Sequence, residues 1–115
     1  MGKAQRDKGA RGERMWAELC RANGFENVKR MGQQQYQRGS EVADCIGLDG
    51  IHQEIKNVQK LNVRRAMEQS IADSKWYELP IVAHHVNRGD WLVTMRAIDW
   101  FKLYKSWQSE MVLEY

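Results

Sequence analysis

Residues 42–58 read Val-Ala-Asp-Cys-Ile-Gly-Leu-Asp-Gly-Ile-His-Gln-Glu-Ile-Lys-Asn-Val, and this stretch indicates how the chain folds. Residues that favour strands flank the dipeptide Asp49-Gly50, which is a strong signal for a hairpin of two antiparallel strands. Successive strand side chains point to opposite faces, so Glu54 and Lys56 emerge on the same face of the sheet. With Asp44 on the preceding strand, the hairpin carries two carboxylates and an amine within a short stretch.

The register of this hairpin decides whether the two carboxylates meet. A two-residue loop would pair Asp44 with Ile55 and would turn the Asp44 side chain away from Glu54. A three-residue loop that ends in a left-handed Gly50 pairs Asp44 with Glu54 instead. We expect this register, or a bulge near Gly47 with the same effect. Because adjacent carboxylates repel each other, the arrangement favours a cation between them.

The rest of the chain extends the hairpin into one domain over residues 1–115. Its order is one helix, three strands, a second helix, two strands and a last helix. The crossover through the second helix should make the third and fourth strands parallel, which predicts an α/β fold with a mixed central sheet flanked by helices. We expect helices at about 10–23, 62–76 and 98–107, and strands at about 27–31, 42–47, 51–58, 81–86 and 91–95.

Apolar residues at helical spacing predict which side of each helix faces the core. In the second helix, Asn62 should act as the N-terminal cap. Three tryptophans, Trp91, Trp100 and Trp107, fit either the core or an apolar surface that pairs two subunits. The side chains that we expect to face inward are Met15, Trp16, Leu19, Cys20, Val63, Met67, Ser70, Ile71, Ser74, Ile98, Phe101 and Tyr104.

Composition and charge narrow the class of protein. The two cysteines, Cys20 and Cys45, lie in apolar surroundings rather than in a Cys-x-x-Cys pair, which favours a reducing, cytoplasmic compartment in a bacterium or a phage-infected cell. We expect no signal peptide and no membrane span. The net charge is only +3, but basic residues gather in 1–14 and 56–65, around the hairpin acids. Such a distribution suits a polyanionic partner, and solvated surface is the alternative for any single residue.

Further residues could complete a site. Glu13 could reach a metal ion directly or through water, although a carboxylate near a helix start is also favoured by the helix dipole. The loop 32–40 offers Gln amides and Tyr36 to phosphates, and a plain flexible loop would look the same. His84 and His85 form a rival candidate, but neighbours in a strand point to opposite faces, which favours satisfied structural histidines.

Three motifs in the chain resemble those of the PD-(D/E)xK, or restriction-endonuclease-like, nuclease superfamily, and most of all its archaeal-type Holliday junction resolvases and their phage relatives. Gly9-Ala10-Arg11-Gly12-Glu13-Arg14 resembles the opening Gly-x-x-x-Glu-Arg segment, Ala43-Asp44 the Pro-Asp element, and Glu54-Ile55-Lys56 the Glu-x-Lys element. Ala43 stands where the family has proline. Gln33, Gln34 and Gln35 occupy the loop in which those resolvases have a functional serine.

The resemblance implies a restriction-endonuclease-like αβββαβ core with an extra C-terminal strand and helix, and Mg²⁺-dependent hydrolysis of DNA by a homodimer, with Mn²⁺ as a substitute metal. Asp44, Glu54 and the Ile55 carbonyl would bind the metal. Lys56 would position the attacking water, and Glu13 would be an accessory acid. The residues that we expect to contact DNA are Arg11, Arg14, Gln33, Gln35, Arg38, Lys60, Arg64 and Gln69.

The leading hypothesis from the sequence is a metal-dependent endonuclease that cuts branched DNA. A general DNA nuclease without junction preference is one alternative. A DNA-binding module that uses the same fold without catalysis is a second, and a structural protein with an incidental ion-pair hairpin is a third.

Overall fold

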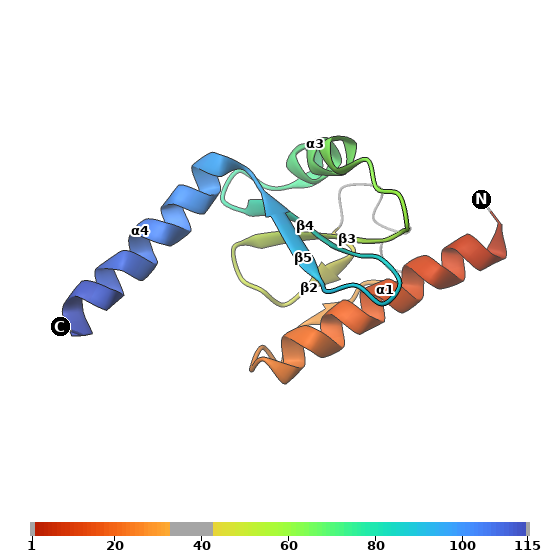
Figure 1. Ribbon diagram of the computed structural model, residues 1–115, viewed down its shortest axis with the longest axis horizontal. Coiled ribbons are helices and arrows are strands. Elements are labelled where there is room, and N and C mark those ends of the chain that lie inside the picture. Colours follow the sequence, from red (N-terminus) through yellow and green to blue (C-terminus); the bar gives the residue numbers. More distant parts are fainter. Residues whose placement is uncertain (1, 33–42, 115) are drawn as a thin grey trace.

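A computed structural model describes residues 2–32 and 43–114 of the chain. The elements follow the predicted order and form a mixed α/β fold (Figure 1). Asn62 caps α3 as predicted, because its side chain accepts a hydrogen bond from the Arg65 amide. The described elements are α1 (Lys3–Ala22), β1 (Lys29–Arg30), β2 (Cys45–Ile46), β3 (Ile51–Asn57), α3 (Val63–Asp73), β4 (Leu79–His85), β5 (Leu92–Met95) and α4 (Ala97–Glu114).

The five described strands form one sheet in the order β1-β2-β3-β4-β5. Only β3 and β4 run parallel, and the α3 crossover joins them, as predicted. Helix α1 covers one face of the sheet and α3 covers the other (Figure 1). Side chains of β3 therefore alternate between an α1 side, with Gln53, Ile55 and Asn57, and an α3 side, with Glu54 and Lys56.

The hairpin adopts the register that brings the carboxylates together. Cys45 pairs with Gln53, which is the alignment that sets Asp44 opposite Glu54. The loop has three residues, closed by a 3.0 Å hydrogen bond from the Ile51 amide to the Leu48 carbonyl. Gly50 takes a φ of 83°, which a side chain would disfavour. The predicted loop length and register are thus both confirmed.

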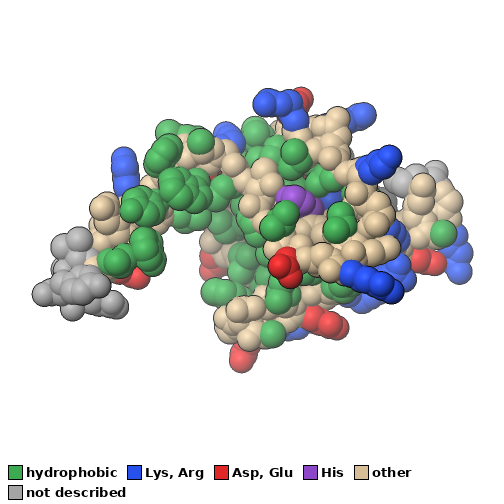
Figure 2. Space-filling model, viewed as in Figure 1, with side chains coloured by type: hydrophobic (Ala, Val, Ile, Leu, Met, Phe, Trp, Pro, Cys, Tyr) green, Lys and Arg blue, Asp and Glu red, His purple; other side chains and the backbone are tan. Residues whose placement is uncertain are grey.

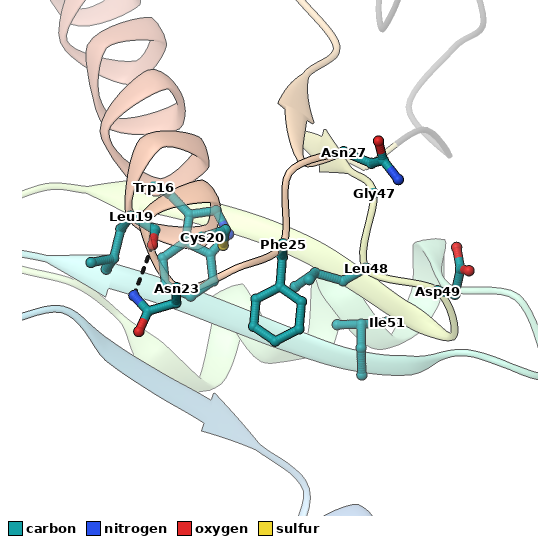
Figure 3. A pocket seen from close by; sticks show the side chains of 10 residues that line it. All are labelled: Trp16, Leu19, Cys20, Asn23, Phe25, Asn27, Gly47, Leu48, Asp49 and Ile51. Atoms are coloured by element: carbon teal, nitrogen blue, oxygen red, sulfur yellow. Dashed lines mark hydrogen bonds between the residues drawn. The ribbon is translucent and has the colours of Figure 1, made fainter.

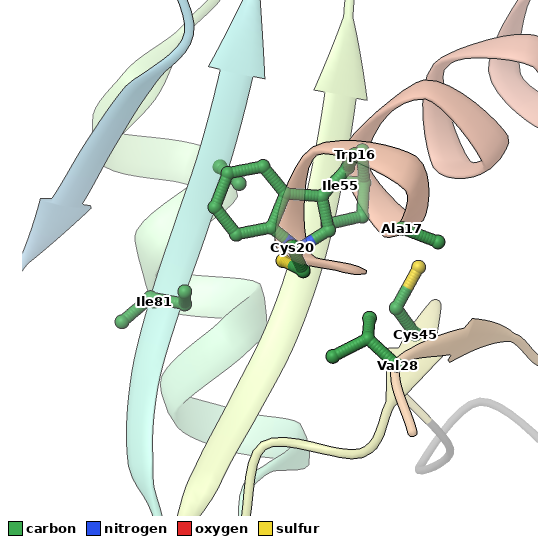
Figure 4. Close-up of a cluster of buried hydrophobic side chains, with 8 residues drawn as sticks. Trp16, Ala17, Cys20, Val28, Cys45, Ile55 and Ile81 are labelled. Carbon is green, nitrogen blue, oxygen red and sulfur yellow. The ribbon is translucent and has the colours of Figure 1, made fainter. Parts of the chain in front are cut away.

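The main core lies between α1 and the sheet (Figure 4). Trp16 is buried there and donates a 2.8 Å hydrogen bond from Nε1 to the Gln53 side chain. Trp91 packs against it with ring centroids 5.4 Å apart, so this tryptophan belongs to the core. Cys20 and Cys45 are buried free thiols whose pKa values burial raises, which makes them packing residues rather than nucleophiles.

Three predictions about helix bounds and one about the inward side of α4 are wrong. Helix α4 runs to Glu114 rather than ending near residue 107. Helix α1 begins at Lys3 rather than near residue 10, because residues 3–8 are good helix formers and the helix continues through Gly9. Helix α3 ends at Asp73 rather than near residue 76. In α4, the three side chains expected to face inward are exposed, since this helix projects beyond the sheet (Figure 1). They are Ile98, Phe101 and Tyr104.

The inward face of α3 also differs from the expected one. Val63 and Ile71 are exposed, and the buried residues are Ala66, Met67 and Ser70. Ser70 donates a 2.9 Å hydrogen bond to the Ile81 carbonyl, so small side chains bring α3 close to β4. In the first helix, Leu19 is likewise exposed. Of the helices in the described ranges, none combines the length and the apolar character that crossing a membrane requires.

Candidate active site

Helix α1 approaches β3 closely just before Glu13. Gly12 lies so near Asn57 that a side chain at this position would collide with the Asn57 side chain. Asn57 also donates a 3.1 Å hydrogen bond from its amide to the Lys8 carbonyl one turn earlier. Gly12 therefore allows the helix to lie close to β3. This close contact fixes the position of the next residue, Glu13, relative to the strand.

Asp44 lies where β2 begins to part from β3. Its backbone amide donates to the Gln53 carbonyl at 3.1 Å, and its own carbonyl accepts a hydrogen bond from the Met31 amide at 2.9 Å. At the next position along β3, the Asp44 side chain takes the place of a backbone acceptor, because its Oδ2 accepts a 2.8 Å hydrogen bond from the Ile55 amide. The amide and carbonyl of one strand residue point to the same side, so the Ile55 carbonyl also faces the Asp44 edge.

The two hairpin carboxyls are buried next to each other. Asp44 is 8% exposed and Glu54 only 3% exposed. Burial raises the pKa of Glu54, and the neighbouring Asp44 carboxyl raises this pKa further, while a hydrogen bond from His52 lowers it. Burying two acids side by side is unfavourable for a fold by itself, and perturbed acids of this kind concentrate at functional sites.

Glu13 belongs electrostatically to the same cluster. Its pKa is raised to about 7, first by burial and then by the charge of Asp44, with a smaller contribution from Glu54. Arg30 opposes this rise, since its Nε donates a 2.9 Å hydrogen bond to the Glu13 Oε1 atom. Burial outweighs the ion pair, so Glu13 exchanges its proton close to neutral pH. The structure thus brings together the three acids that the sequence singled out.

His52 is a member of the site that the sequence reasoning did not identify. The side chain is 2% exposed, and its Nε2 atom lies 3.0 Å from Oε1 of Glu54. On its other side, Nδ1 lies 3.8 Å from the Glu78 carboxylate. The sequence could have indicated that His52 lies beside Glu54, because His52, Glu54 and Lys56 are every second residue of the strand and so share one face.

Lys56 is half-buried on the same face of β3 as Glu54. The Lys56 amine forms no ion pair or hydrogen bond with another described residue. Lys56 follows Glu54 by two residues, so the two side chains are neighbours along the same face of β3. From this position the amine could approach an anion held beside the acids. The predicted trio of Asp44, Glu54 and Lys56 lies on one face.

The donor set suits a hard cation, since it consists of carboxylate oxygens and a backbone carbonyl at one edge. Within residues 2–32 and 43–114, however, no three His, Cys, Asp or Glu side chains are arranged to hold a metal ion together. Glu13 is instead paired with Arg30, and Glu54 lies 3.0 Å from His52. The carboxyl oxygens of Asp44 and Glu54 are donors of the type that Mg²⁺ prefers in proteins.

Five of the residues expected to contact DNA are exposed at the surface. Figure 2 shows that basic side chains on this face lie mainly over α1 and around α3, with few on α4. Arg11 and Arg14 are exposed on α1, Lys60 follows β3, and Arg64 and Gln69 are exposed on α3. The other three candidates, Gln33, Gln35 and Arg38, lie outside the described residues, as does the rest of the glutamine-rich loop.

The histidine pair at the end of β4 is structural, as expected. His84 lies 2.9 Å from the Thr94 hydroxyl, and burial lowers its pKa. His85 points to the opposite face, where it lies 3.3 Å from the Asn57 side chain and stacks on Trp91. Each histidine therefore has its own partner, and the two side chains do not form one site.

A separate apolar groove of about 690 Å³ lies beside the C-terminal half of α1 (Figure 3). Side chains from α1, the turn after it and the hairpin loop line this groove, among them Leu19, Phe25, Leu48 and Ile51. None of the predicted catalytic or metal-binding residues lines it. The groove is thus distinct from the acid cluster.

The chain was compared with models of protein families, with curated proteins and with solved structures, and it matches none of them. Its function must therefore be argued from the geometry of the acid cluster.

Proposed function

We propose that the protein is a metal-dependent DNA endonuclease with a restriction-endonuclease-like core of the PD-(D/E)xK type. The observation that carries this proposal is the pairing of Asp44 with Glu54 across the hairpin, with Lys56 on the same face. The order of elements, with one helix before three strands and a crossover helix before the fourth, is compatible with that core. Phosphodiester hydrolysis is the chemistry that this set of groups can perform.

Each group has a distinct role in this proposal. Asp44, Glu54 and the Ile55 carbonyl would hold Mg²⁺, which when bound supplies a Lewis acid for the phosphate and lowers the pKa of a water molecule. The hydrogen bond from the Ile55 amide fixes the orientation of the Asp44 carboxylate in advance. Lys56 would donate to the phosphate, orient the attacking water and offset the charge that develops on the phosphate oxygens.

Glu13 would act as the accessory acid. Since its pKa is about 7, this carboxyl group can both accept and release a proton near neutral pH. A cation bound by Asp44 and Glu54 would lower that pKa, because positive charge favours the carboxylate form. Glu13 would then complete the set of acids around the cation, directly or through water.

DNA is the substrate class that fits the surroundings of the site. Arg11 and Arg14 are exposed on the helix that carries Glu13, and Lys60 is exposed just after the strand that carries Lys56. These side chains can neutralise phosphates, which would make binding strongly dependent on salt. Within this class we propose branched DNA, such as a four-way junction, as the substrate. The motifs of α1 and the hairpin support this choice through their resemblance to those of junction resolvases.

One observation favours a second candidate function. The described residues contain no ready group of three metal ligands, which is the arrangement expected of a DNA-binding module that uses this fold without catalysis. The two functions differ in whether Asp44 matters for cleavage or only for folding. Both predict binding of DNA, so binding alone does not separate them.

The experiment incubates a labelled four-way junction, a linear duplex and a single strand with the purified protein and Mg²⁺, Mn²⁺ or EDTA. We expect paired nicks in the junction that require the metal and that Asp44→Asn abolishes. Asp49→Asn is the matched control, because Asp49 is exposed in the same hairpin and should leave cleavage unchanged. Equal cutting of linear duplex would indicate a general nuclease, and binding without cutting would indicate the non-catalytic module.

A further inference from the structure

The turn between β4 and β5 holds an arginine in a backbone conformation that side chains disfavour. Residues 86–89 form a β-turn, closed by a 3.0 Å hydrogen bond from the Gly89 amide to the Val86 carbonyl. Arg88, the third residue of this turn, has a φ of 62° and is the one described residue other than glycine with a positive φ. Glycine or asparagine normally occupies a turn position of this kind. The arginine is therefore strained, and strained residues concentrate at functional sites.

This turn is held against the loop that follows β3. The Asn87 amide donates a 2.7 Å hydrogen bond to the Gln59 side chain. Strands β3 and β4 run parallel, with Asn57 paired to His85, so the loop and the turn leave the same end of the sheet (Figure 1). The Asn57 side chain lies 3.3 Å from His85 and donates a hydrogen bond to the Lys8 carbonyl of α1. The two loops thus form one supported edge at the carboxyl ends of β3 and β4.

Each of the two loops carries an exposed cation directly after the residue that joins it to the other. Lys60 follows Gln59, and Arg88 follows Asn87. Neither cation has an ion-pair partner in the part of the chain that the structure describes. The two loops contain a single acid, Asp90. This edge therefore presents a net positive charge on a rigid support, which suits an anion.

The place of this edge along β3 indicates which anion it meets. Strand β3 continues from Glu54 through Lys56 to its end at Asn57, so the edge lies ~10 Å beyond Glu54 at about 3.3 Å per residue. One strand of duplex DNA advances about 3.4 Å per nucleotide, so this separation corresponds to about three nucleotides. The carboxyl ends of parallel strands are also a common place for ligands in α/β sheets.

We propose that Arg88, together with Lys60, binds a phosphate of the DNA backbone about three nucleotides from the phosphate that is cut. The identity of this anion rests on the proposed nuclease function, whereas the strain and the charge at the edge do not. The planar guanidinium group of Arg88 can hold two phosphate oxygens at once. An arginine that served solubility alone could stand at another position of the turn without strain. Because the contact is with the backbone, it adds affinity without sequence preference.

The test measures binding of a fluorescently labelled four-way junction and of a linear duplex, in EDTA to prevent cleavage and over a range of KCl concentrations. Arg88→Asn keeps a residue that tolerates the turn conformation, and it should weaken binding of both DNAs by about 3- to 10-fold. The slope of log affinity against log salt should fall by about one, which corresponds to one lost phosphate contact. The matched control, Lys105→Gln, removes a charge from the projecting helix α4 and should leave the slope unchanged (Figure 1). An unchanged slope in Arg88→Asn, or an equal loss in Lys105→Gln, would overturn the proposal.

A second measurement separates a binding role of Arg88 from a structural one. Arg88→Gly should lose as much DNA affinity as Arg88→Asn, yet keep or raise the midpoint of urea unfolding, because glycine adopts a positive φ without strain. A fall in both affinity and midpoint would show that Arg88 supports the fold, and would overturn the proposal.

The outcomes also separate this contact from the proposed function. If the wild type cuts the junction and the Arg88 variants bind it normally, only the contact is refuted. If the variants bind more weakly but the wild type never cuts, the contact is supported and the nuclease is refuted. A wild type that binds no DNA would refute both.

Discussion

The acid cluster and helix α4 both depart from what a small domain needs for stability, in opposite ways. The cluster buries Asp44 and Glu54 side by side, whereas α4 exposes Trp100 and Trp107 to solvent. Burying two carboxyl groups side by side and exposing large aromatic side chains are each unfavourable in an isolated chain. We infer that the cluster is arranged for a cation and a polyanion, whereas the apolar side chains of α4 lie uncovered among the described residues.

The contrast extends to how the two regions are held. The cluster is fixed from several directions, because Asp44 is bonded to Met31, Gln53 and Ile55. At the start of helix α4, the ion pairs of Asp99 with Arg96 and Lys102 are local, since each joins residues three positions apart. A site for chemistry needs such rigid support around its reacting groups.

The largest expected effect is on cleavage. Asp44→Asn or Lys56→Ala should lower the rate of DNA hydrolysis by about 100-fold or more, since each removes a group that acts on the transition state. Neither change should lower the free energy of unfolding to a similar degree. Single-turnover cleavage and chemical denaturation of the same samples measure both quantities. Loss of folding in parallel with loss of cleavage would mean that Asp44 is structural.

The second prediction concerns the close approach of α1 to β3. Gly12→Ala should destabilise the protein by about 1–3 kcal/mol, because the new methyl group overlaps the Asn57 side chain. Gly9→Ala on the same helix is the matched control, since space around it is open and alanine favours a helix. Urea denaturation of both variants gives the comparison. Equal stabilities would show that α1 can move away from the sheet at little cost.

The third prediction is a pH dependence of stability. Glu13 has a folded pKa of about 7 against an ordinary value of 4.5, so the folded state binds the extra proton between these values. Stability should therefore fall as pH rises from about 4.5 to about 7, by up to ~3 kcal/mol for this group, because each unit of pKa difference corresponds to about 1.4 kcal/mol. The fall should be smaller in Glu13→Gln, which carries no titrating group at this position.

Thermal unfolding from pH 4.5 to 8, with and without Mg²⁺, measures this dependence. A cation at the cluster should restore stability mainly at the high end of the range, where the acids are ionised. Glu18→Gln on the exposed side of α1 is the control and should leave the profile unchanged. An identical pH profile in wild type and Glu13→Gln would show that Glu13 does not carry the shifted proton.

The fourth prediction assigns His52 a positioning role at Glu54. His52→Ala should weaken Mn²⁺ binding and lower cleavage by about 10-fold, as for other residues that orient metal ligands. His52→Gln keeps a donor near the carboxylate and should restore part of the loss. Calorimetric titration of Mn²⁺ gives a readout that a purely structural role would not separate between the two variants.

The smallest expected effect is on stability when an exposed side chain of α4 is altered. Trp107→Ser should change the free energy of unfolding by less than ~0.5 kcal/mol, because this side chain is half-exposed. Urea denaturation of the wild type and the variant makes the comparison. A loss of more than ~1 kcal/mol would show that Trp107 is packed against another part of the protein.

Much of the site could be predicted from the sequence because its information is local. Asp49-Gly50 and the left-handed Gly50 set the loop, and the loop sets which residue faces Glu54. Lys56 follows from the two-residue period of a strand. The link from His52 to Glu78 was not predictable in the same way, because Glu78 reaches β3 only through the parallel pairing of β4.

Helices illustrate the same limit. The apolar period of α4 was visible in the sequence, but whether that side would meet the sheet was not. The start of α1 was also missed, since helix formers at 3–8 are compatible with either a helix or a coil until the Asn57 side chain bonds the Lys8 carbonyl. In both cases the helix could be recognised from its local sequence, but the segments that it contacts could not.

By itself, the sequence determined the order of elements and the side of β3 that carries the acid and the lysine, because these depend on local pattern and strand period. The hairpin register was open between two loop lengths until the pairing of Cys45 with Gln53 decided it. Only the tertiary structure decided that Glu13 joins the hairpin acids with a pKa near neutrality, and that α4 lies uncovered. Burial and the approach of distant segments produce both results, and neither quantity is encoded in any short stretch of chain.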